Sequence, residues 1–584
     1  MLYFIIAWVM LLTACEVVGL GIVNSFNATR IERQGDRAIV ALWLGVIALA
    51  ISLLVVSWFV ALSPLVGGVV TLGLMSLALR SHAVRQELRS LYGGVSRDRI
   101  FKFFMLAIAV ALVVTQPINW FDTGFYHYSA IQWLTKFGTV PGVALILDQL
   151  GFTSSWFALA APFNFELLDS RGTAVINGFG LLLTSLQGWL CFTRAYQRTA
   201  QLSDWFAIAF SLFLGLLILR LYSSVSLLNS ASPDLAVMLL IEVVAWTILV
   251  YARPAALPEK TVLGTPAIVL VLASGAFTTK LTALPLLAIA GVFVGVESAV
   301  SKQGIKRLLA STGVASLVLL PLCISSLITS GCPLYPASAL CLDLPWSPDA
   351  TAMQAIASNT HGSTTWYGSS PDHPFPLIGY IQRWVATSRH NMIIAGLSLS
   401  HFFTSGLLFI VQTRRKATQI KGAIWLFAVG TVGILLLLFM APWIRFLASY
   451  LLLSPALLVA TWLEHQFGNR PAGDLSSHPS RSTPRLRWLQ GVGLCFLAIA
   501  LVHLTRRDFQ LHVVLPPRLM SVELVQKQVH NVSYVSPLHS DSESIAPLSN
   551  LCWGSPIPCT HLNLKNVALR DPQAGLAEGF IRLN

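Results

Sequence analysis

The chain has 584 residues, of which 55% are hydrophobic and only 11% are charged. A soluble domain usually carries about 25% charged residues, so water-soluble, fibrous and disordered proteins are excluded. The 38 Lys and Arg residues outnumber the 25 Asp and Glu residues, which gives a formal net charge of +13. The apolar stretches are continuous rather than alternating, which excludes a transmembrane β-barrel. The composition therefore predicts an all-α polytopic membrane protein.

Fourteen segments are apolar enough, over a length of about 20 residues, to be interpreted as membrane spans. Turn residues such as Ser63 and Pro64 separate neighbouring spans. The third, fourth and ninth spans are short, so the sequence defines their ends least well. The predicted spans are residues 2–23, 39–61, 64–79, 103–118, 172–193, 205–222, 235–252, 262–279, 281–296, 308–329, 392–411, 423–441, 446–463 and 488–504.

The loops between these spans form two alternating sets that differ in charge. One set holds 24 of the 38 Lys and Arg residues, and the opposite set holds only a few. Positive residues collect in cytoplasmic loops, so the basic set is cytoplasmic. The N-terminus and the C-terminal tail then lie outside the cytoplasm, in a bacterial inner (plasma) membrane. Because topology explains the basic excess, membrane lipids are expected partners and nucleic acid is not. The basic loops are residues 24–38, 80–102, 194–204, 253–261, 297–307, 412–421 and 464–487.

Three segments outside the cytoplasm are long. Irregular backbone of that length must lie outside the lipid or in a protein-lined cavity, and long ordered loops usually carry function. The chain therefore divides into five regions: an N-terminal three-span unit with a basic cytoplasmic loop (1–102), a core (103–330) that includes the first outer loop (119–171), an extracytoplasmic loop (331–391), C-terminal spans (392–504) and a small extracytoplasmic tail (505–584).

Four of the eight cysteines fall in segments predicted to lie outside the cytoplasm. Cys332 and Cys341 share one loop, and Cys552 and Cys559 share the tail. Each pair is close enough in sequence to form a disulfide in an oxidising compartment, although four free thiols also fit the pattern. No spacing of Cys and His residues resembles a zinc site, so the sequence predicts no metal ligands.

The first outer loop begins with a polar and aromatic run over residues 119–134. Its apolar spacing predicts an amphipathic helix that lies on the membrane surface. Asp122 lies at the start of this helix, where aspartate is a favoured N-cap. A carboxylate at the outer interface could also take a proton from an alcohol or an amine. The two interpretations do not exclude each other, and the sequence leaves both open.

Four more charged residues are predicted at the depth of Asp122. Asp234 lies where the seventh span re-enters the membrane, so it is either a helix cap or a second interfacial acid. Three cations, Arg220, Lys280 and Arg445, lie at the outer ends of spans, against the positive-inside trend. Each could simply extend to the lipid headgroups. Together they could bind a phosphate, because arginine makes paired hydrogen bonds and lysine acts as a point charge.

Short motifs of the chain resemble those of the GT-C superfamily of membrane glycosyltransferases. The resemblance extends from about residue 103 to residue 460, so the first three spans and the tail lie outside it. Two positions depart from the family pattern, since Thr123 follows Asp122 where a second acid is common, and Phe446 replaces a tyrosine. The motifs are the Asp and Tyr of the first outer loop, the Gly-x-x-Pro turn at 138–141, the Thr-Lys step within 277–284, and Arg445-Phe446 followed by Pro455.

This resemblance implies a GT-C-like fold, and the apolar segments predict about fourteen transmembrane helices for the whole chain. It also implies an inverting enzyme that transfers a sugar from a polyprenyl-phosphate donor to a glycan or lipid acceptor in cell-envelope glycan synthesis. No cofactor is certain, and use of a divalent cation is left open. The implied residues are Asp122 and Asp234 for catalysis, with Asp122 as the base; Lys280, Arg445 and Arg220 for the donor phosphate; and Tyr126, His127, Trp366 and Tyr367 for the substrate. Trp366 and Tyr367 could equally line the small core of their own loop.

Over its whole length the chain is also similar to a bacterial family of large polytopic proteins of unassigned function. They share the Asp-Thr-Gly-x-Tyr-His motif, the stretches 151–156 and 333–336, and a Cys-Trp…Pro-Cys tail. Two alternatives to the transferase stay open. A transporter or flippase of lipid-linked glycans predicts ionisable residues at mid-span, of which Glu16 and Glu242 are the main ones. A catalytically inactive GT-C-like scaffold would bind or assemble other proteins.

Overall fold

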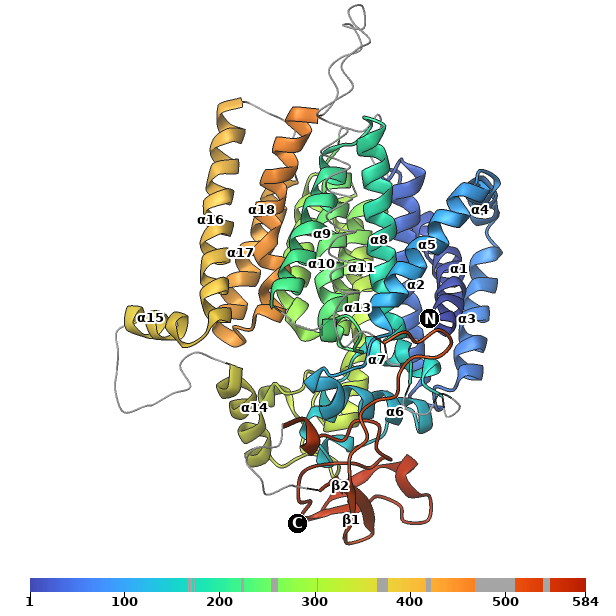
Figure 1. Cartoon of the computed structure of the whole chain (residues 1–584), viewed down its shortest axis with the longest axis vertical. Helices are drawn as coiled ribbons and strands as arrows, with labels where there is room; N and C mark the ends of the chain where they lie inside the picture. The colour runs from blue at the N-terminus through green and yellow to red at the C-terminus, as the bar shows by residue number, and fades with distance from the viewer. Residues whose placement is uncertain are drawn as a thin grey trace, which may run out of the picture.

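The chain folds into a helical bundle with polar loops and a small C-terminal region gathered at one end (Figure 1). We call this end the tail side and the opposite end the far side. The computed structural model describes residues 1–165, 168, 171–172, 174–221, 225–253, 261–301, 303–364, 377–415, 422–467, 510–538 and 547–583.

Ten helices within the described residues are long and apolar enough to cross a membrane, or eleven if one bent pair counts as a single span. The protein is therefore a polytopic integral membrane protein, and ten or eleven of the fourteen predicted spans are found among the residues that the structure describes. The ten are α1 (Leu2–Phe26), α2 (Gln34–Val56), α8 (Val175–Tyr196), α9 (Leu202–Leu221), α10 (Pro233–Tyr251), α12 (Leu284–Ala299) with its preceding turn η7 (Leu281–Ala283), α13 (Gly304–Ser330), α16 (Arg389–Arg415), α17 (Ala423–Met440) and α18 (Ile444–Phe467).

Four predicted spans account for the difference. α3 (Pro64–Leu79) meets α4 (His82–Gly93) at an angle of 99°, and these two helices form the bent pair. α5 (Arg97–Val114) begins with a turn of charged residues, which are costly inside the hydrocarbon. α11 (Gly264–Thr279) has 16 residues, fewer than the roughly 20 that a span needs. The predicted span 488–504 lies outside the described residues.

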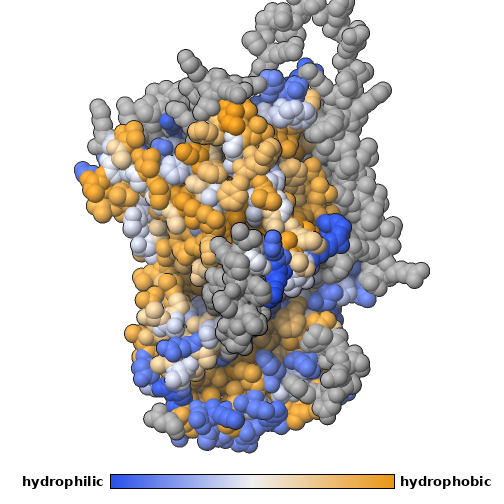
Figure 2. Space-filling model, turned by 90° about the vertical axis from the view of Figure 1, so that its left-hand side faces the viewer, coloured by the Kyte–Doolittle hydropathy of each residue, from blue (hydrophilic) through white to orange (hydrophobic). Residues whose placement is uncertain are grey.

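The perimeter of the bundle is apolar, as a lipid environment requires. Large exposed hydrophobic side chains include Leu65 and Val69 of α3 and Leu399 and Phe403 of α16. The face drawn in Figure 2 is largely hydrophobic over the bundle, and many of its hydrophilic residues lie at the lower end, where Figure 1 places the tail. α10 differs from the other spans, because 94% of its apolar window is buried inside the protein. It therefore forms the centre of the bundle.

Local sequence signals position the helix ends on the tail side. The Ser63 hydroxyl accepts a hydrogen bond from the backbone N–H of Val66 and caps α3. The Ser232 hydroxyl caps α10 in the same way, and Pro233 occupies the first helical position. Gly331 ends α13 with φ of 77°, a left-handed conformation that glycine adopts without strain.

The first outer loop folds into several short helices rather than one surface helix. The apolar face of α6 (Tyr128–Lys136) is buried in protein, since Ile131 and Trp133 are 0% and 3% exposed. The prediction that this helix lies on the membrane surface is therefore wrong. The loop contains the π-helix η1 (Thr123–His127), α6 (Tyr128–Lys136), η2 (Val143–Leu145), η3 (Asp148–Gly151), α7 (Ser155–Ala160) and η4 (Ala161–Phe163). The second long loop contains η8 (Ser338–Leu340), α14 (Ala350–Thr364) and α15 (Leu377–Thr387).

The tail contains two small antiparallel sheets, which the prediction of an all-α fold missed. The strands are β1 (Leu524–Val529) paired with β2 (Val532–Pro537), and β3 (Val567–Leu569) paired with β4 (Phe580–Arg582). Short 3-10 turns, η11 (Pro547–Asn550) and η12 (Gly575–Glu578), lie between them.

Backbone hydrogen bonds tie the tail to three distant segments. The N–H of Leu2 donates to Val513, the N–H of Trp553 donates to Gly124, and the N–H of Arg582 donates to Pro345. The tail thus crosses the tail side from the N-terminal helix over the first outer loop to the second. It holds together parts of the chain that are hundreds of residues apart in sequence.

Candidate functional site

Four charged side chains from four elements meet at the tail side of the bundle, and we call them the tail-side cluster. Asp122 precedes η1, Asp234 is the second residue of α10, Lys280 separates α11 from η7, and Arg445 is the second residue of α18. Arg445 Nη1 lies 2.6 Å from Asp122 Oδ2, and Lys280 Nζ lies 2.5 Å from Asp234 Oδ1. Arg445 Nε lies 3.8 Å from Asp234 Oδ2. The structure therefore brings together four of the five charges that the sequence placed at one depth.

The cluster balances two carboxylates with two cations, and its members differ in exposure. The side chain of Asp234 is 1% exposed, whereas those of Asp122, Lys280 and Arg445 are 13%, 19% and 22% exposed. Asp234 is therefore the most enclosed member of the cluster, and the two cations keep partial access to solvent. A ligand anion could reach the cations without unfolding the bundle.

The local sequence explains why neither aspartate serves as a helix cap. Ser232, not Asp234, caps α10, and its hydroxyl donates to Asp234 Oδ2 at 3.1 Å. Asp122 occupies the N-cap position of η1 but makes no capping hydrogen bond. Its carboxylate accepts from Arg445 instead. The interpretation of these two residues as caps is therefore wrong, because a charged partner competes better for a carboxylate than a backbone N–H does.

Aromatic rings surround the two cations. The Arg445 guanidinium lies 5.6 Å from the ring centre of Trp120, 5.4 Å from that of Trp443 and 5.0 Å from that of Phe446. The Lys280 ammonium lies 4.4 Å from the ring centre of Phe446. Aromatic faces attract cations and hold them in place. The sequence interpretation missed these rings, although Trp443 and Phe446 stand within two residues of Arg445 in the chain.

His127 is a neutral histidine buried beside this cluster. Its side chain is 0% exposed, and neither ring nitrogen has a hydrogen-bond partner among the described residues. Burial lowers the pKa of His127 to about 4, so the ring is uncharged at neutral pH. The buried hydroxyl of Thr123 likewise has no partner in the described part of the chain. Unpaired buried polar atoms are costly, so the groups of η1 are available to a bound molecule or to water.

Tyr126 lies between the cluster and the apolar interior of the loop. Its ring is 4.4 Å from that of His127 and 6.3 Å from that of Phe152. Burial, and after it the negative charge of Asp122, raises the pKa of Tyr126 well above its ordinary value. Its hydroxyl therefore stays protonated and can act as a hydrogen-bond donor.

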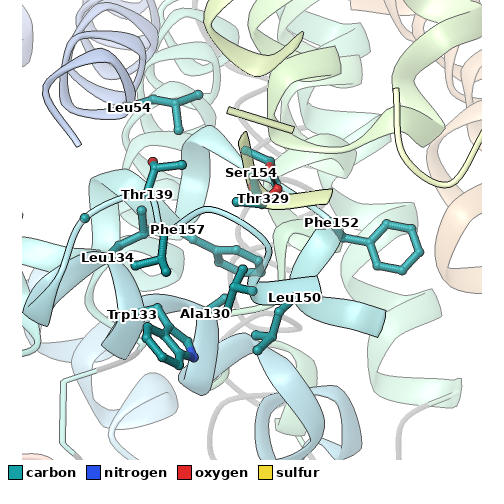
Figure 3. A pocket seen from close by; sticks show the side chains of 14 residues that line it. Leu54, Ala130, Trp133, Leu134, Thr139, Leu150, Phe152, Ser154, Phe157 and Thr329 are labelled. Atoms are coloured by element: carbon teal, nitrogen blue, oxygen red, sulfur yellow. Dashed lines mark hydrogen bonds between the residues drawn. The ribbon is translucent and has the colours of Figure 1, made fainter. Parts of the chain in front are cut away.

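A cavity of about 40 Å³ lies between α6, α7 and the loop that joins them (Figure 3). Phe157 lines it and also contacts His127, with 5.2 Å between the ring centres. Leu150 and Trp133 provide much of its apolar wall, and Thr139, Ser154 and Thr329 contribute hydroxyl groups. A space of this size holds a few water molecules at most. It contains no member of the tail-side cluster, so we do not assign it to substrate.

Three predicted site residues lie outside this arrangement. Arg220 is exposed at the last turn of α9, and none of the contacts that define the cluster involves it. Trp366 and Tyr367 lie outside the described residues. Among the residues that the structure does describe, no group of three or more His, Cys, Asp or Glu side chains converges to hold a metal ion.

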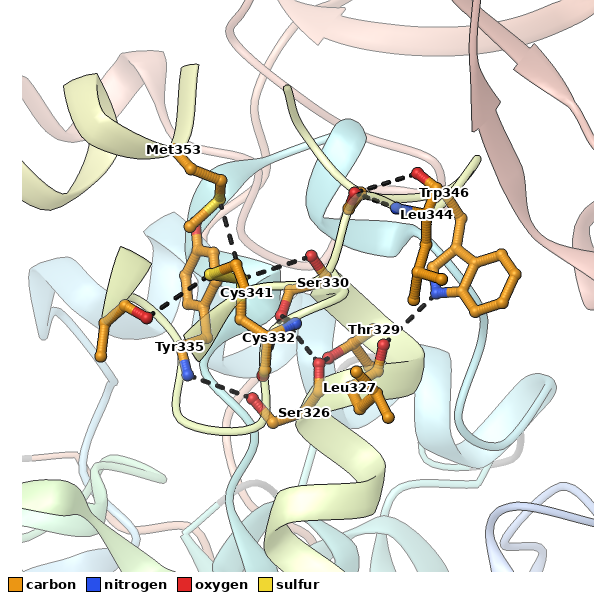
Figure 4. Close-up of a disulfide and its surroundings, with 12 residues drawn as sticks. Ser326, Leu327, Thr329, Ser330, Cys332, Tyr335, Cys341, Leu344, Trp346 and Met353 are labelled. Atoms are coloured by element: carbon orange, nitrogen blue, oxygen red, sulfur yellow. Dashed lines mark hydrogen bonds between the residues drawn. A yellow bond between two sulfur atoms is a disulfide. The ribbon is translucent and has the colours of Figure 1, made fainter. Parts of the chain in front are cut away.

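Two disulfides stabilise the loops on the tail side. Cys332 and Cys341 are joined just after α13, where the bridge contacts Met353 of α14 (Figure 4). Cys552 and Cys559 are joined in the tail. The second bridge begins one residue before Trp553, which is 1% exposed and packs on η1. A Cβ atom added at Gly124 would lie 2.5 Å from this indole ring, so only glycine allows the tail to approach this closely.

The fold and the cluster together define a polytopic membrane protein with an organised polar site at one end of its helical bundle. Residues 1–452 match a family described as a domain of unknown function, DUF8201, and the chain belongs to this family. No curated protein matches the chain. No solved structure matches it either.

Proposed function

We propose that the protein transfers a sugar from a polyprenyl-phosphate donor to a glycan or lipid acceptor in cell-envelope glycan synthesis. The observation that carries the proposal is the tail-side cluster, in which two partly exposed cations neutralise two carboxylates. Arginine and lysine both bind phosphate well, arginine through two parallel hydrogen bonds. A donor phosphate that binds Lys280 and Arg445 would replace their carboxylate partners. The GT-C resemblance of the same residues supports this assignment.

Displacement of Arg445 would prepare Asp122 for catalysis. Without its arginine partner, the Asp122 carboxylate is free to accept the proton of the acceptor hydroxyl. The acceptor oxygen then bonds to the anomeric carbon while the bond from that carbon to the phosphate oxygen breaks. The electron pair leaves with the polyprenyl phosphate, whose charge Lys280 and Arg445 stabilise. Tyr126 and His127 of η1 supply uncharged hydrogen-bonding groups for the sugar.

In this proposal the protein lies in a bacterial inner membrane, and its tail side faces away from the cytoplasm. Positive residues are concentrated in the loops of the far side, as the positive-inside rule requires of cytoplasmic loops. Both disulfides lie on the tail side, and disulfides persist in oxidising compartments.

Native mass spectrometry of the detergent-purified protein with added short-chain polyprenyl phosphate tests the proposal. Each charge-assisted hydrogen bond lost costs about 1.5–3 kcal/mol, so Arg445→Ala should weaken binding about 10- to 100-fold. Arg220→Ala is the matched control, because Arg220 is an exposed arginine outside the cluster, and it should bind as the wild type does. Asp122→Asn should retain binding and lose sugar transfer. Equal binding by wild type, Arg445→Ala and Lys280→Ala would contradict the proposal.

A transporter of lipid-linked glycans is the second candidate, and one observation favours it. Glu242 is 1% exposed near the middle of α10, and ionisable residues at mid-span often mark transport pathways. Transport predicts movement of a lipid-linked glycan across a vesicle membrane without change of its mass. Transfer predicts release of free polyprenyl phosphate, so mass spectrometry of the lipid products separates the two functions.

A further inference from the structure

The centre of the bundle contains an acid, Glu242, that makes no ion pair with the residues that the structure describes. Glu242 of α10 accepts one hydrogen bond, from Gln187 Nε2 of α8 to Glu242 Oε1 at 3.0 Å. The described ion pairs do not include Glu242. An ionised carboxylate in such surroundings is very costly and is normally neutralised. The surroundings of Glu242 therefore favour its protonated, neutral form.

The remaining polar atoms of this pair indicate which oxygen of Glu242 would carry the proton. Glu242 Oε2 and Gln187 Oε1 are both buried and have no hydrogen-bond partner in the described part of the chain. Both atoms are acceptors, so they cannot bond to each other directly. A proton on Glu242 Oε2 converts that oxygen into a donor to Gln187 Oε1. A carboxylic acid and an amide can make two parallel hydrogen bonds in this way, which would satisfy both unpaired oxygens.

A polar stripe along α8 connects this pair to the far side. Thr184, Gln187, Cys191 and Arg194 follow each other at spacings of three, four and three residues, which places them on one face of the helix. Cys191 and Gln187 are fully buried, and Arg194 bonds to Asp36 at the far end of the bundle. Seven residues of helix separate Gln187 from Arg194, a rise of about 10 Å. A proton could reach Glu242 along this face.

Other elements around Glu242 bring no competing charge to this level. The thiol of Cys191 is the titratable group that faces it from α8. α9 and α18 also pack on α10 and carry charged residues only at their ends, and the sequences of α11 and α17 contain none. Glu242 is therefore the acidic residue that these helices place at this level of the bundle.

We propose that Glu242 and Gln187 form a proton-binding site inside the membrane, and that this proton exchanges with water through the α8 stripe. The proposal is independent of the proposed transfer reaction, which uses the tail-side cluster. Its chemistry involves one proton: the carboxylate gains it on Oε2 and donates it in a hydrogen bond to the Gln187 amide oxygen. Release of the proton leaves an unpaired negative charge between α8 and α10, which favours separation of these helices or entry of water.

Infrared difference spectroscopy of the purified protein tests the proposal directly. A protonated carboxyl group has its own C=O stretching band, distinct from that of a carboxylate. This band should be present in wild type at neutral pH, absent from Glu242→Gln, and shifted to lower frequency in D2O because the proton exchanges. Glu242→Gln is expected to fold, since an amide–amide pair keeps two hydrogen bonds.

Two further variants keep the experiment decisive. Glu16→Gln removes another buried acid, whose carboxylate accepts from Tyr92, and it should leave the Glu242 band unchanged. Gln187→Leu should keep the band and move it to higher frequency, because the acid loses both hydrogen bonds; this variant also serves if Glu242→Gln does not fold. A band that is identical in wild type and Gln187→Leu, or that does not shift in D2O, would overturn the proposal.

Discussion

Both ends of the bundle carry a cluster in which two aspartates pair with basic side chains, yet the two clusters differ in the number of cations and in exposure. The far-side cluster comprises Asp36, Asp204, Arg33, Arg194 and Arg253. Both of its carboxylates are 0% exposed, and Asp36 alone bonds to all three arginines. In the tail-side cluster two acids meet two cations, and three of the four side chains are partly exposed. The first arrangement fixes helices, and the second can exchange its partners for a ligand.

This difference predicts that the two clusters contribute unequally to the free energy of unfolding. Removal of one member from a buried ion pair leaves an unpaired charge, which costs about 3–5 kcal/mol, whereas exposed pairs contribute about 0–1 kcal/mol. We therefore expect substitutions on the far side to reduce stability and substitutions on the tail side to reduce function. The following predictions test that contrast, from the largest effect to the smallest.

Asp36→Asn should destabilise the protein most, by about 3–5 kcal/mol, because three arginines would lose their shared anionic partner. Thermal unfolding of the detergent-purified protein measures the effect. Asp98→Asn is the matched control, since Asp98 forms an exposed pair with Lys102, and it should unfold like wild type. An unchanged midpoint for Asp36→Asn would show that the far-side cluster does not stabilise the bundle.

His127 should make stability depend on pH. Its pKa is about 4 in the folded protein and about 6.5 when unfolded, so below pH 6.5 the unfolded chain binds the proton more strongly. Stability contributed by the neutral ring is complete above about pH 6.5 and is lost as the pH falls to about 4, by roughly 3 kcal/mol.

Unfolding curves of wild type and His127→Phe between pH 4 and 7 check this prediction. The Phe variant should lose the slope assigned to His127. His390→Phe changes an exposed histidine and should keep the slope. Parallel curves for wild type and His127→Phe would show that the buried histidine does not titrate in this range.

Gly124→Ala should loosen the tail from the tail-side cluster. The added methyl group would overlap the Trp553 indole, and overpacking of this kind costs about 1–3 kcal/mol. Limited proteolysis should cut the tail faster in this variant than in wild type. Gly68→Ala is the control, because a Cβ atom there meets no neighbour within 4 Å. Equal cleavage rates for Gly124→Ala and Gly68→Ala would mean that Trp553 does not hold the tail.

Asp122→Asn should have the smallest effect on stability, within about 1 kcal/mol, because its pair with Arg445 is partly exposed. The same substitution should abolish the proposed transfer reaction. Parallel measurement of the unfolding midpoint and of sugar transfer makes the contrast with Asp36→Asn quantitative. A large loss of stability in Asp122→Asn would assign both clusters the same structural role.

Much of the architecture follows from hydropathy, because a bilayer allows few backbone solutions. Four helices begin within two residues of their predicted first residue; they start at Leu2, Pro64, Pro233 and Ala423. Hydropathy alone does not register the bend between α3 and α4 or the charged start of α5, so these two predicted spans are not among the ten long apolar helices of the described residues. Nor did it reveal the tail sheets, whose strands are short and mostly polar on one side.

The amino-acid sequence by itself determined that this is a polytopic membrane protein and that charged residues stand at one depth against the positive-inside trend. Only the tertiary structure decided that Asp122 pairs with Arg445 across 323 positions of the chain, and that Arg220 stays apart. Residues distant in sequence meet when helices pack, and that packing depends on side-chain shapes summed over the whole bundle. The same holds for Glu242. Its proposed role in proton binding follows from the unpaired oxygens Glu242 Oε2 and Gln187 Oε1, which belong to two residues that helix packing brings together.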